Sequence, residues 1–319
     1  MPPAQSYVAP PAPLLGLGLG ILAVSTASLF IRYAQTDGVP SLVIAAYRLV
    51  IASLVLLPMV AWRERAALRR LTTREWRLAA GSGLCLGVHF AAWISSLAYT
   101  SVASSVVLVS TAPLFVAVLA VVFLRERLTG SVLLGLGLTL AGATVVGLSD
   151  ACQAPMGCPP LESFVRGPAF YGDVLALVGA AAGAVYYSLG RALRPTMPLL
   201  VYVSVTYGTA ALVLAGAMLA ARLPATGYAP SAYLWLVLLA LVPQLLGHSS
   251  FNWALRFLPA SYVSIMALGE PVAAIALAAL FLGDVPTPLK LAGSALILVG
   301  LAIASRHATT TTPAAAAVG

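Results

Sequence analysis

Apolar residues along the chain are gathered into long runs that are separated by short polar segments. Ten of these runs approach the length of about 20 residues that an α-helix needs to cross a bilayer. The ten runs are residues 14–31, 42–62, 78–98, 103–124, 132–148, 170–190, 198–220, 234–254, 262–282 and 291–305. The pattern predicts an all-α membrane protein with ten transmembrane helices, five in each half of the chain.

The composition also indicates a membrane protein. Hydrophobic residues make up 61% of the 319 residues and charged residues 8%, against roughly 25% charged residues in soluble domains. The formal net charge is +8, but the cations lie at the ends of the apolar runs and form no basic face. We therefore expect the lipid bilayer to be a partner and nucleic acid not to be one.

The two halves of the chain resemble each other in sequence. A shift of 158 residues aligns residues 97–142 with residues 255–300 without a gap. The coinciding residues include Pro113 and Pro271, Gly135 and Gly293, Gly142 and Gly300, and Glu126 and Asp284. Because each copy holds an odd number of spans, the second copy must cross the bilayer in the opposite orientation. Two inverted five-helix repeats are typical of secondary transporters, which bind substrate where the halves meet.

The repeat and the apolar runs divide the chain into five segments. Residues 14–149 and 169–306 form the two five-helix repeats, and residues 150–168 form an external linker between them. Residues 1–13 form an N-terminal cytoplasmic segment, and the Thr/Ala-rich residues 307–319 form a disordered cytoplasmic tail. The N-terminal segment has no basic n-region, so we expect no cleaved signal peptide.

Basic residues are distributed unequally between the two sides of the predicted bundle. Twelve follow the even-numbered spans, whereas Arg32, Arg166, Arg222 and Lys290 lie on the other side. The twelve are Arg63, Arg65, Arg69, Arg70, Arg74, Arg77, Arg125, Arg127, Arg191, Arg194, Arg256 and Arg306. Cytoplasmic loops carry the excess of Arg and Lys. The bias therefore places both termini in the cytoplasm, and we expect the bilayer to be a bacterial cytoplasmic (inner) membrane.

The sequence contains no motif that indicates catalysis, a cofactor or a metal. Gly16, Gly18 and Gly20 resemble part of a dinucleotide-binding loop, but no strand precedes them, and they fit close helix packing better. Cys152 and Cys158 share the external linker, where a disulfide and two free thiols are equally compatible with the sequence and a metal site is less so. We expect a protein that is not an enzyme and has no cofactor.

Glu270 is an acid within a predicted span. It lies about nine residues into the run 262–282, which at 1.5 Å per residue is roughly 14 Å deep, near the bilayer midplane. A charged group at this depth costs about 3 kcal/mol and is usually retained for function. We favour a functional role in coupling or ion pairing over a buried neutral acid beside a helix kink.

Three prolines interrupt predicted spans. Pro113 and Pro271 occupy equivalent positions in the two repeats, and Pro243 lies within the eighth run. A proline inside a helix removes one backbone donor, so we expect a kink at each of them. Paired interruptions of this kind point to a central site in transporters, although Pro113 alone is better explained as a packing kink.

Polar side chains form stripes on the third and eighth predicted spans. Their residues, spaced by four in each set, are Cys85, His89 and Trp93, and Gln244, His248 and Asn252. Residues four apart share one face of a helix. In the 158-residue register His89 falls one residue from His248. Two histidines at nearly equivalent depth in opposed repeats favour a shared cavity, whereas either one alone is equally compatible with packing.

Arg48 and two adjacent tyrosines complete the candidate site. Arg48 lies roughly 10 Å from the outer end of the second span, where the side chain can snorkel to the surface. We favour snorkelling slightly; the alternative is an ion pair with a substrate carboxylate or with Glu270. Tyr186 and Tyr187 offer one ring to the interior whichever way their helix turns. The candidates for the interfacial aromatic belt include Tyr47, Tyr202, Tyr207 and Trp253.

Several short motifs resemble those of the EamA-type members of the drug/metabolite transporter superfamily. The resemblance covers residues 14–305, and its most specific parts include Ala45-Ala46-Tyr47-Arg48, Ala112-Pro113-Leu114-Phe115, Gly172-Asp173 and Gly269-Glu270-Pro271-Val272. It implies ten helices in two inverted repeats, with both termini cytoplasmic. It also implies export, exchange or uptake of small metabolites, notably amino acids and amphipathic compounds. Asp284 stands where the second repeat commonly has Glu, and the lack of lysine within any span argues against sugar-phosphate exchange.

These observations favour a secondary transporter that moves a small-molecule substrate outward by alternating access. An acid, two histidines and aromatic rings suit a zwitterionic or amphipathic solute with an amine, best an amino acid, rather than a polyanion. The candidate binding residues are His89, Trp93, Tyr186, Tyr187, Gln244, His248, Asn252 and Glu270, with Glu270 and Arg48 as candidates for coupling or ion pairing.

Protons are the candidate coupling ion, and the sequence leaves the oligomeric state open, a monomer included. One alternative function is an uncoupled, channel-like facilitator. A non-transporting membrane scaffold or receptor is the less favoured alternative, because such a protein is expected to carry a large soluble domain or long tails.

Overall fold

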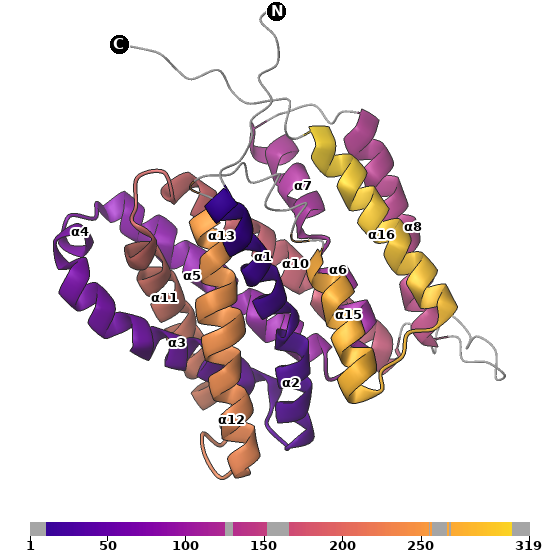
Figure 1. The fold of residues 1–319 in the computed structure, drawn as a ribbon, viewed down its shortest axis with the longest axis horizontal. Coiled ribbons are helices and arrows are strands. Elements are labelled where there is room, and N and C mark those ends of the chain that lie inside the picture. Colours follow the sequence, from indigo (N-terminus) through magenta and orange to yellow (C-terminus); the bar gives the residue numbers. More distant parts are fainter. Residues whose placement is uncertain are drawn as a thin grey trace, which may run out of the picture.

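The computed structural model describes residues 11–124, 130–151, 166–254, 256, 267 and 269–307, and within these ranges every secondary-structure element is a helix (Figure 1). The first half contains α1 (Pro11–Ser25), α2 (Ala27–Thr36), α3 (Ser41–Arg63), α4 (Arg65–Arg69), α5 (Thr73–Ser96), α6 (Val102–Val109), α7 (Ala112–Leu124) and α8 (Gly130–Ala151). The second contains α10 (Pro168–Leu193), α11 (Leu199–Ala220), α12 (Pro230–Leu239), η1 (Ala240–His248), α13 (Ser249–Ala254), α15 (Gly269–Leu282) and α16 (Pro288–His307). Cys152, Cys158 and Glu126 lie outside the described residues.

Six helical segments are long and apolar enough to cross a membrane. They are Leu15–Thr36, Ser41–Arg63, Thr73–Ser96, Pro168–Leu193, Leu199–Ala220 and Pro230–Ala254. Shorter apolar helices cover Val102–Val116, Leu133–Val146, Gly269–Leu282 and Pro288–Ile303. The protein is therefore an all-helical, multi-pass membrane protein. The count of ten spans stays a prediction, although each predicted run overlaps one of these helices.

Local sequence explains where several helices begin. Thr72 precedes α5 and forms a capping box with Glu75: the Thr72 hydroxyl accepts from the Glu75 N–H, and the Glu75 carboxylate accepts from the Thr72 N–H at 2.8 Å. Ser101 caps α6 in the same way by accepting from the Ser104 N–H. Pro168 and Pro230 open α10 and α12, where the missing N–H costs nothing.

The three prolines expected to kink helices act in different ways. Pro113 follows a break at residues 110–111 and lies in the first turn of α7, so the fourth predicted span is two helices rather than one bent helix. Pro271 lies in α15, and residue 267 before it is helical as well. Pro243 lies inside η1, a nine-residue π-helix that interrupts the eighth predicted span. In a π-helix each N–H bonds five residues back, and such segments are frequent at functional sites.

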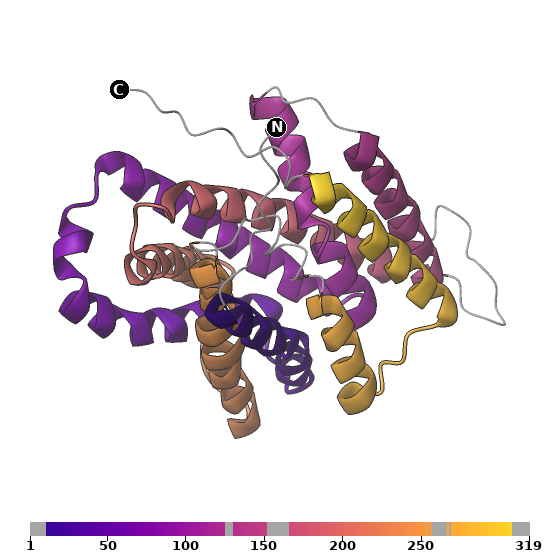
Figure 2. The same ribbon diagram turned by 45° about the horizontal axis from the view of Figure 1, so that its top comes forward.

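Helices of the two halves pack in matched pairs (Figures 1 and 2). In the repeat, α5 is equivalent to α12, η1 and α13, and α10 is equivalent to α1 and α2. The pairing of α5 with α10 is therefore repeated by that of α1 with η1 and α13 and by that of α2 with α12. Contacts of α10 with α6 and α7 correspond to those of α15 with α1 and α2. Three further pairs join equivalent helices of the two halves: α3 with α11, α6 with α15, and α8 with α16. Exchanging the halves leaves the pairs named so far unchanged, whereas the contacts of α16 with α6 and of α10 with α8 have no counterpart of similar size among the described residues.

Glycines allow close contact between α8 and α16. A Cβ atom on Gly142 would lie 2.6 Å from the carbonyl oxygen of Gly293, and one on Gly300 would lie 2.7 Å from the carbonyl oxygen of Gly135. The two contacts cross in sequence, so the helices are antiparallel. Because Gly135 matches Gly293 and Gly142 matches Gly300 in the repeat, each contact is the image of the other.

Glycines expected to serve helix packing in α1 do so in part. A Cβ atom on Gly16 would lie 2.6 Å from the Trp253 ring, and one on Gly20 would lie 3.0 Å from Cβ of Ser250. Gly18 has nothing within 4 Å, so the packing interpretation is wrong for that residue. The close approach of α1 to α13 brings this part of the second half against the first.

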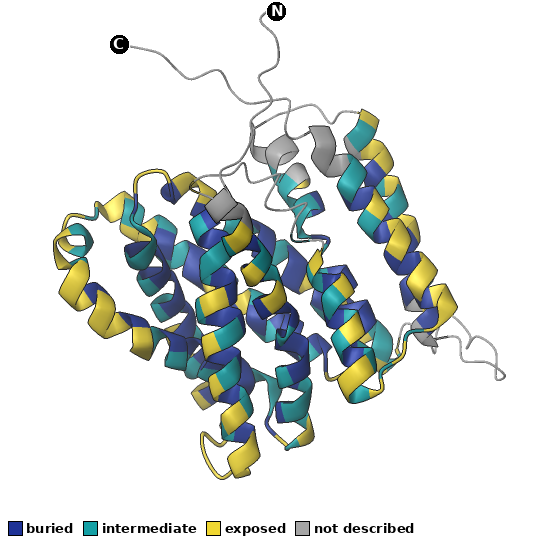
Figure 3. Cartoon of the chain, viewed as in Figure 1, coloured by how far each residue is buried: buried dark blue, intermediate teal, exposed yellow. Residues whose placement is uncertain are grey.

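Burial follows the arrangement expected of a helical bundle in lipid (Figure 3). Buried residues line the contacts between helices, and many exposed residues are large and apolar; Leu212, Leu219 and Leu280 are 77%, 67% and 75% exposed. In water such a surface would be unfavourable. Around a bilayer-spanning bundle it is the surface that faces lipid.

Candidate substrate-binding site

A cluster of polar and aromatic side chains lies buried between helices of both halves. Its members are Arg48 of α3, Phe90 and Trp93 of α5, Tyr186 of α10, Gln244 and His248 of η1, and Asn252 of α13. Each of these side chains is buried. Buried polar groups are usually hydrogen-bonded because desolvation without a partner is costly. The bonds that each member makes therefore decide what the cluster can do.

Arg48 lies at the centre of the cluster. Its side chain is fully buried (0% exposed), so the prediction that it snorkels to the surface is wrong. The Nε–H donates to Oε1 of Gln244 at 2.7 Å, and the guanidinium carbon lies 3.9 Å from the centroid of the Phe90 ring. The same guanidinium carbon lies 6.0 Å from the centroid of the Trp93 ring. The packing of α3 against α5 and η1 directs the side chain into the protein, toward Gln244.

The two predicted histidines meet at one aromatic ring. The centroid of Phe90 lies 4.8 Å from that of His89 and 5.3 Å from that of His248, both in edge-on geometry. His89 Nδ1 is 2.8 Å from the carbonyl oxygen of Gly179, and its ring stacks on Trp93. Nδ1 of His248 has no hydrogen-bond partner among the described residues. Residues far apart in sequence are thereby brought to one place.

Asn252 hydrogen-bonds to two other cluster residues, both in the second half of the chain. Its amide nitrogen donates to the Tyr186 hydroxyl and to the His248 carbonyl, each at 2.9 Å. Tyr186 is the buried member of the tyrosine pair, whereas Tyr187 is half-buried with its ring 4.9 Å from that of Tyr186. Tyr207 is fully buried beside Ser249, so it is no belt residue, and neither is the fully buried Tyr202.

Glu270 lies apart from these hydrogen bonds. It is the second residue of α15 and is half-buried, and its main-chain carbonyl accepts from the Ser25 hydroxyl at 3.3 Å. Among the described residues no side chain hydrogen-bonds to the Glu270 carboxylate. The structure thus groups His89, Trp93, Tyr186, Gln244, His248 and Asn252 with Arg48, and it leaves Glu270 beside α1.

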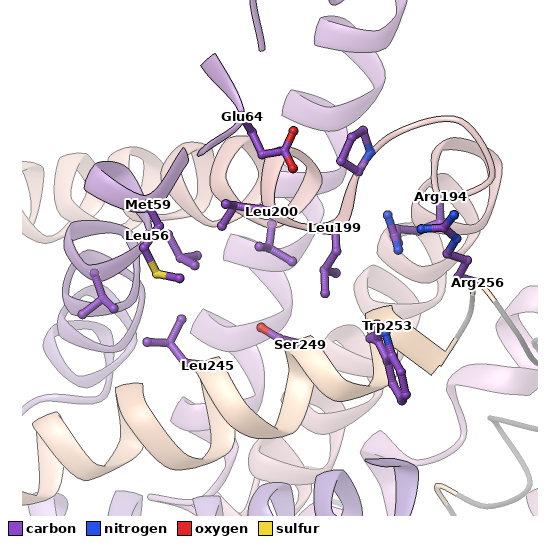
Figure 4. Close-up of a pocket in the computed structure, with 13 residues that line it drawn as sticks. Leu56, Met59, Glu64, Arg194, Leu199, Leu200, Leu245, Ser249, Trp253 and Arg256 are labelled. Atoms are coloured by element: carbon purple, nitrogen blue, oxygen red, sulfur yellow. The ribbon is translucent and has the colours of Figure 1, made fainter. Parts of the chain in front are cut away.

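A pocket of about 480 Å³ lies next to the cluster (Figure 4). Its lining is mostly apolar and comes from the C-terminal half of α3, the start of α11, η1 and α13; the polar residues are Glu64, Arg194, Ser249 and Arg256. Figure 4 shows Arg194 and Arg256 on the side of Trp253, with Ser249 on the pocket floor. Hydropathy alone could not identify this pocket, because lining residues such as Leu56 and Leu200 look like lipid-facing ones in the sequence.

The pocket and the cluster share a wall formed by η1 and α13. Ser249 lines the pocket, and its hydroxyl lies 3.5 Å from the hydroxyl of the buried Tyr207. Arg194 also lines the pocket; its Nε–H donates to the carbonyl of Asn252 at 3.1 Å, and a terminal nitrogen donates to the carbonyl of Met197. The pocket and the cluster are therefore separated by η1 and α13.

No group of three or more His, Cys, Asp and Glu side chains suited to a metal occurs within the described residues. The cluster instead offers one guanidinium, the imidazole of His248, two amides and aromatic faces, and the imidazole of His89 lies beside it against Phe90 and Trp93. These groups suit an uncharged or zwitterionic organic solute with an apolar part.

A known protein family matches most of the chain. The model of the EamA-like transporter family matches twice, to residues 12–148 and 170–306. The chain belongs to this family. The two matches also agree with the two repeats seen in the sequence. The protein is therefore a membrane transporter of the EamA-like family, with two EamA repeats.

Two curated relatives and one solved structure are similar to this EamA-like chain. An uncharacterized transporter of Archaeoglobus fulgidus is 29% identical over 65% of the chain and 69% of its own length. A probable terminal-alkyne amino-acid exporter of Streptantibioticus cattleyicolor is 30% identical over 63% of each protein. A solved crystal structure covering 94% of the chain has a TM-score of 0.63 at 21% identity, which supports the fold alone.

Proposed function

We propose that this EamA-like protein is a secondary transporter that moves a small zwitterionic or amphipathic metabolite, an amino acid in the best-fitting case, across the bacterial cytoplasmic membrane. Transport is outward and proceeds by alternating access. The ten helices form two inverted five-helix repeats, and both termini are cytoplasmic.

The inverted arrangement is supported by the contact between α8 and α16. These are the fifth helices of the two repeats, and their glycine contacts require them to run antiparallel. Equivalent helices that run in opposite directions are what inversion of one repeat produces. The exchange symmetry of the other helix pairs agrees with this interpretation.

The observation that carries the proposal is the buried cluster itself. Within the described part of the chain, Arg48, Trp93, Gln244, His248 and Asn252 each have a side-chain nitrogen or oxygen atom without a hydrogen-bond partner, and they lie together in the core between the two halves. A packing role would favour satisfied or apolar groups, because unpaired polar atoms destabilise a core. A bound polar solute would satisfy them.

The two ends of the bundle differ in a way that supports alternating access. At the end that the charge bias makes external, the halves are linked by hydrogen bonds, such as those from the Val102 N–H to Asp284 at 2.9 Å and from the Lys290 ammonium to the Ser101 hydroxyl at 2.8 Å. The pocket beside Glu64 and Arg194 lies at the opposite end. An inward-open conformation of a transporter has this combination.

Direction and substrate class rest on the relatives and the chemistry of the cluster. The Streptantibioticus cattleyicolor relative is described as a probable amino-acid exporter. A zwitterion also suits a site with one guanidinium, neutral polar groups and aromatic rings better than a polyanion does. Protons are the coupling ion that we propose.

Uptake into proteoliposomes tests the proposal. The purified chain, reconstituted alone, should transport labelled amino acids with apolar or aromatic side chains, and an imposed proton gradient should change their accumulation. Sugars and sugar phosphates should not be transported. If none of the amino acids enters faster than in protein-free liposomes, the proposed substrate class is wrong.

A further inference from the structure

The guanidinium of Arg48 uses only one of its five N–H donor positions within the protein. Its Nε–H donates to Gln244, whereas neither terminal nitrogen has a hydrogen-bond partner among the described residues. The side chain is fully buried, so bulk water does not solvate these donors. Buried charges in proteins are normally paired, because an unpaired charge in the core is strongly unfavourable. The four remaining donors, for which the described residues supply no hydrogen-bond acceptor, are therefore available to an anion.

The guanidinium is also held in a fixed orientation. Gln244 fixes one edge of the planar group through Nε, and Phe90 packs against its face with the guanidinium carbon 3.9 Å from the ring centroid. The opposite edge, formed by the two terminal nitrogens, is thereby left for a partner. Two parallel N–H donors in this geometry match the two oxygens of a carboxylate.

Other unsatisfied groups surround this edge from different helices. Three atoms have no hydrogen-bond partner among the residues that the structure describes: the indole Nε1 of Trp93 on α5, Nδ1 of His248 on η1 and Oδ1 of Asn252 on α13. They include hydrogen-bond donors and an acceptor, and aromatic rings lie between them. Such surroundings suit a solute with one charged group and an apolar body. A polyanion would have one cation, Arg48, to pair with.

We propose that Arg48 binds the carboxylate of the transported solute through its two terminal nitrogens, so that the transporter selects α-amino acids and related monocarboxylates over amines. The proposal rests on the proposed function, since it assigns a substrate group within that same site. Gln244 and Phe90 are positioning residues that hold the guanidinium plane.

An internal ion pair with Glu270 is the competing role for Arg48. The terminal nitrogens of Arg48 make no hydrogen bond to Glu270, whose hydrogen bond in the structure goes through its main-chain carbonyl to Ser25. The two roles make opposite predictions for a double variant. In an internal pair, neutralising both members restores function, whereas a carboxylate site stays lost.

The experiment measures the binding of three probes to the full chain in lipid nanodiscs by isothermal titration calorimetry. L-phenylalanine carries a carboxylate and an amine, 3-phenylpropionate carries only the carboxylate, and 2-phenylethylamine carries only the amine. The variants are Arg48→Gln, Arg48→Lys and Arg48→Gln combined with Glu270→Gln. Arg63→Gln is the matched control, because Arg63 lies on the same helix but is exposed.

We expect Arg48→Gln to weaken L-phenylalanine and 3-phenylpropionate by at least about 30-fold, the size usual for a buried charge pair. Binding of 2-phenylethylamine should change by less than about threefold. Arg48→Lys keeps the charge but loses the planar fork, so both carboxylates should bind about tenfold more weakly. This second variant gives the answer if Arg48→Gln does not fold. Arg63→Gln should match the wild type.

Three results of the binding experiment would overturn the proposal. The first is carboxylate binding that neither Arg48 variant weakens. The second is equal loss of the amine probe, which would indicate general disruption. The third is recovery of L-phenylalanine binding in the double variant, which would make Arg48 and Glu270 an internal pair. A wild type that transports solutes without a carboxylate equally well would leave a transporter but remove this inference, whereas a wild type that transports none of the tested solutes would remove the proposed function.

Discussion

At the scale of single residues, the contact between Arg48 and Gln244 organises the candidate site. Arg48 is anchored through one nitrogen, so Gln244 decides where the other two point. A hydrogen bond to a charged group contributes about 1.5–3 kcal/mol. The amide of Gln244 is buried with the guanidinium, so neither partner can exchange the bond for water.

Replacing Gln244 with Leu should therefore release Arg48 without removing its charge. We expect the affinity for L-phenylalanine to fall about tenfold, measured by calorimetry on the reconstituted chain. Leu241→Ala, a change at an exposed position on the same helix, is the control and should have no effect. Unchanged affinity in Gln244→Leu would mean that Arg48 is held by other contacts.

Glu270 is the residue to which we assign coupling. Replacement by Gln keeps the size of the side chain but removes its ability to exchange a proton. Net accumulation of substrate driven by a proton gradient should be abolished, whereas exchange of labelled for unlabelled substrate should persist. Wild-type accumulation and pH dependence in Glu270→Gln would leave this acid as a structural residue beside Pro271.

Sequence reasoning placed some of these residues well and others badly, for physical reasons. The spacing of Gln244, His248 and Asn252 predicted one helix face, and all three side chains are buried in the structure. Arg48 was misjudged because its depth along the helix axis says nothing about which way the helix is turned. That rotation is set by packing against α5 and η1, residues far away in the sequence.

At the scale of helices, the interruptions differ from what the prolines alone indicated. The π-helix η1 cannot be seen in hydropathy, since it changes the hydrogen-bond spacing and not the residue types. A π turn holds more residues than an α turn. This difference is consistent with the one-residue offset of His248 from His89 in the repeat register. Both histidine rings contact Phe90 despite that offset.

The glycine contacts between α8 and α16 give a stability prediction with an internal control. Gly142→Ala places a Cβ atom 2.6 Å from a main-chain oxygen of α16. The helices must separate, so we expect a loss of about 1–3 kcal/mol and a lower Tm in detergent. Gly137→Ala on the same helix has nothing within 4 Å and should be neutral or slightly stabilising. Equal Tm values for the two variants would contradict the close packing.

Asp284 links the halves at the predicted external end. Its carboxylate accepts from the Val102 N–H at the start of α6, where the helix dipole favours a negative charge. The repeat had marked Asp284 as a matched acid without giving it a role. Its contact is with the other half, which sequence comparison within one chain does not reveal.

Removal of this cap should open the external end. Asp284→Ala, which forfeits about 1 kcal/mol of capping, should increase the rate at which an external impermeant thiol reagent modifies Val102→Cys by about fivefold. The background is a chain without native cysteines. Asp284→Asn can still accept the hydrogen bond and should stay close to the wild type. No difference between the Ala and Asn variants would mean that Asp284 does not hold this end closed.

At the scale of the whole molecule, the fold was predictable and the pocket was not. Apolar runs, the duplicated segments and the charge bias are properties of the sequence itself, and the helices and the family match agree with the first two. The pocket depends on how α3, α11 and η1 diverge. That divergence follows from packing between the halves, which no run of residues encodes by itself.

Orientation in the membrane is a separate prediction at this scale. Ala66 and Thr226, to be replaced by cysteine one at a time in a chain without native cysteines, lie between predicted spans on opposite sides of the bundle; Ala66 is in the short helix α4. An impermeant thiol reagent added to intact cells should modify the cysteine at residue 226 and spare that at residue 66. The reverse pattern would invert the topology and make the pocket external.

The central claim is that this EamA-like protein is a carrier whose buried cluster is exposed to one side at a time. Counterflow tests it most directly. Proteoliposomes loaded with unlabelled L-phenylalanine and diluted into a trace of the labelled compound should accumulate label transiently above its equilibrium level, and Arg48→Gln should abolish this overshoot. Label that enters wild-type liposomes only to equilibrium, with no overshoot at any internal concentration, would identify an uncoupled channel and contradict the account.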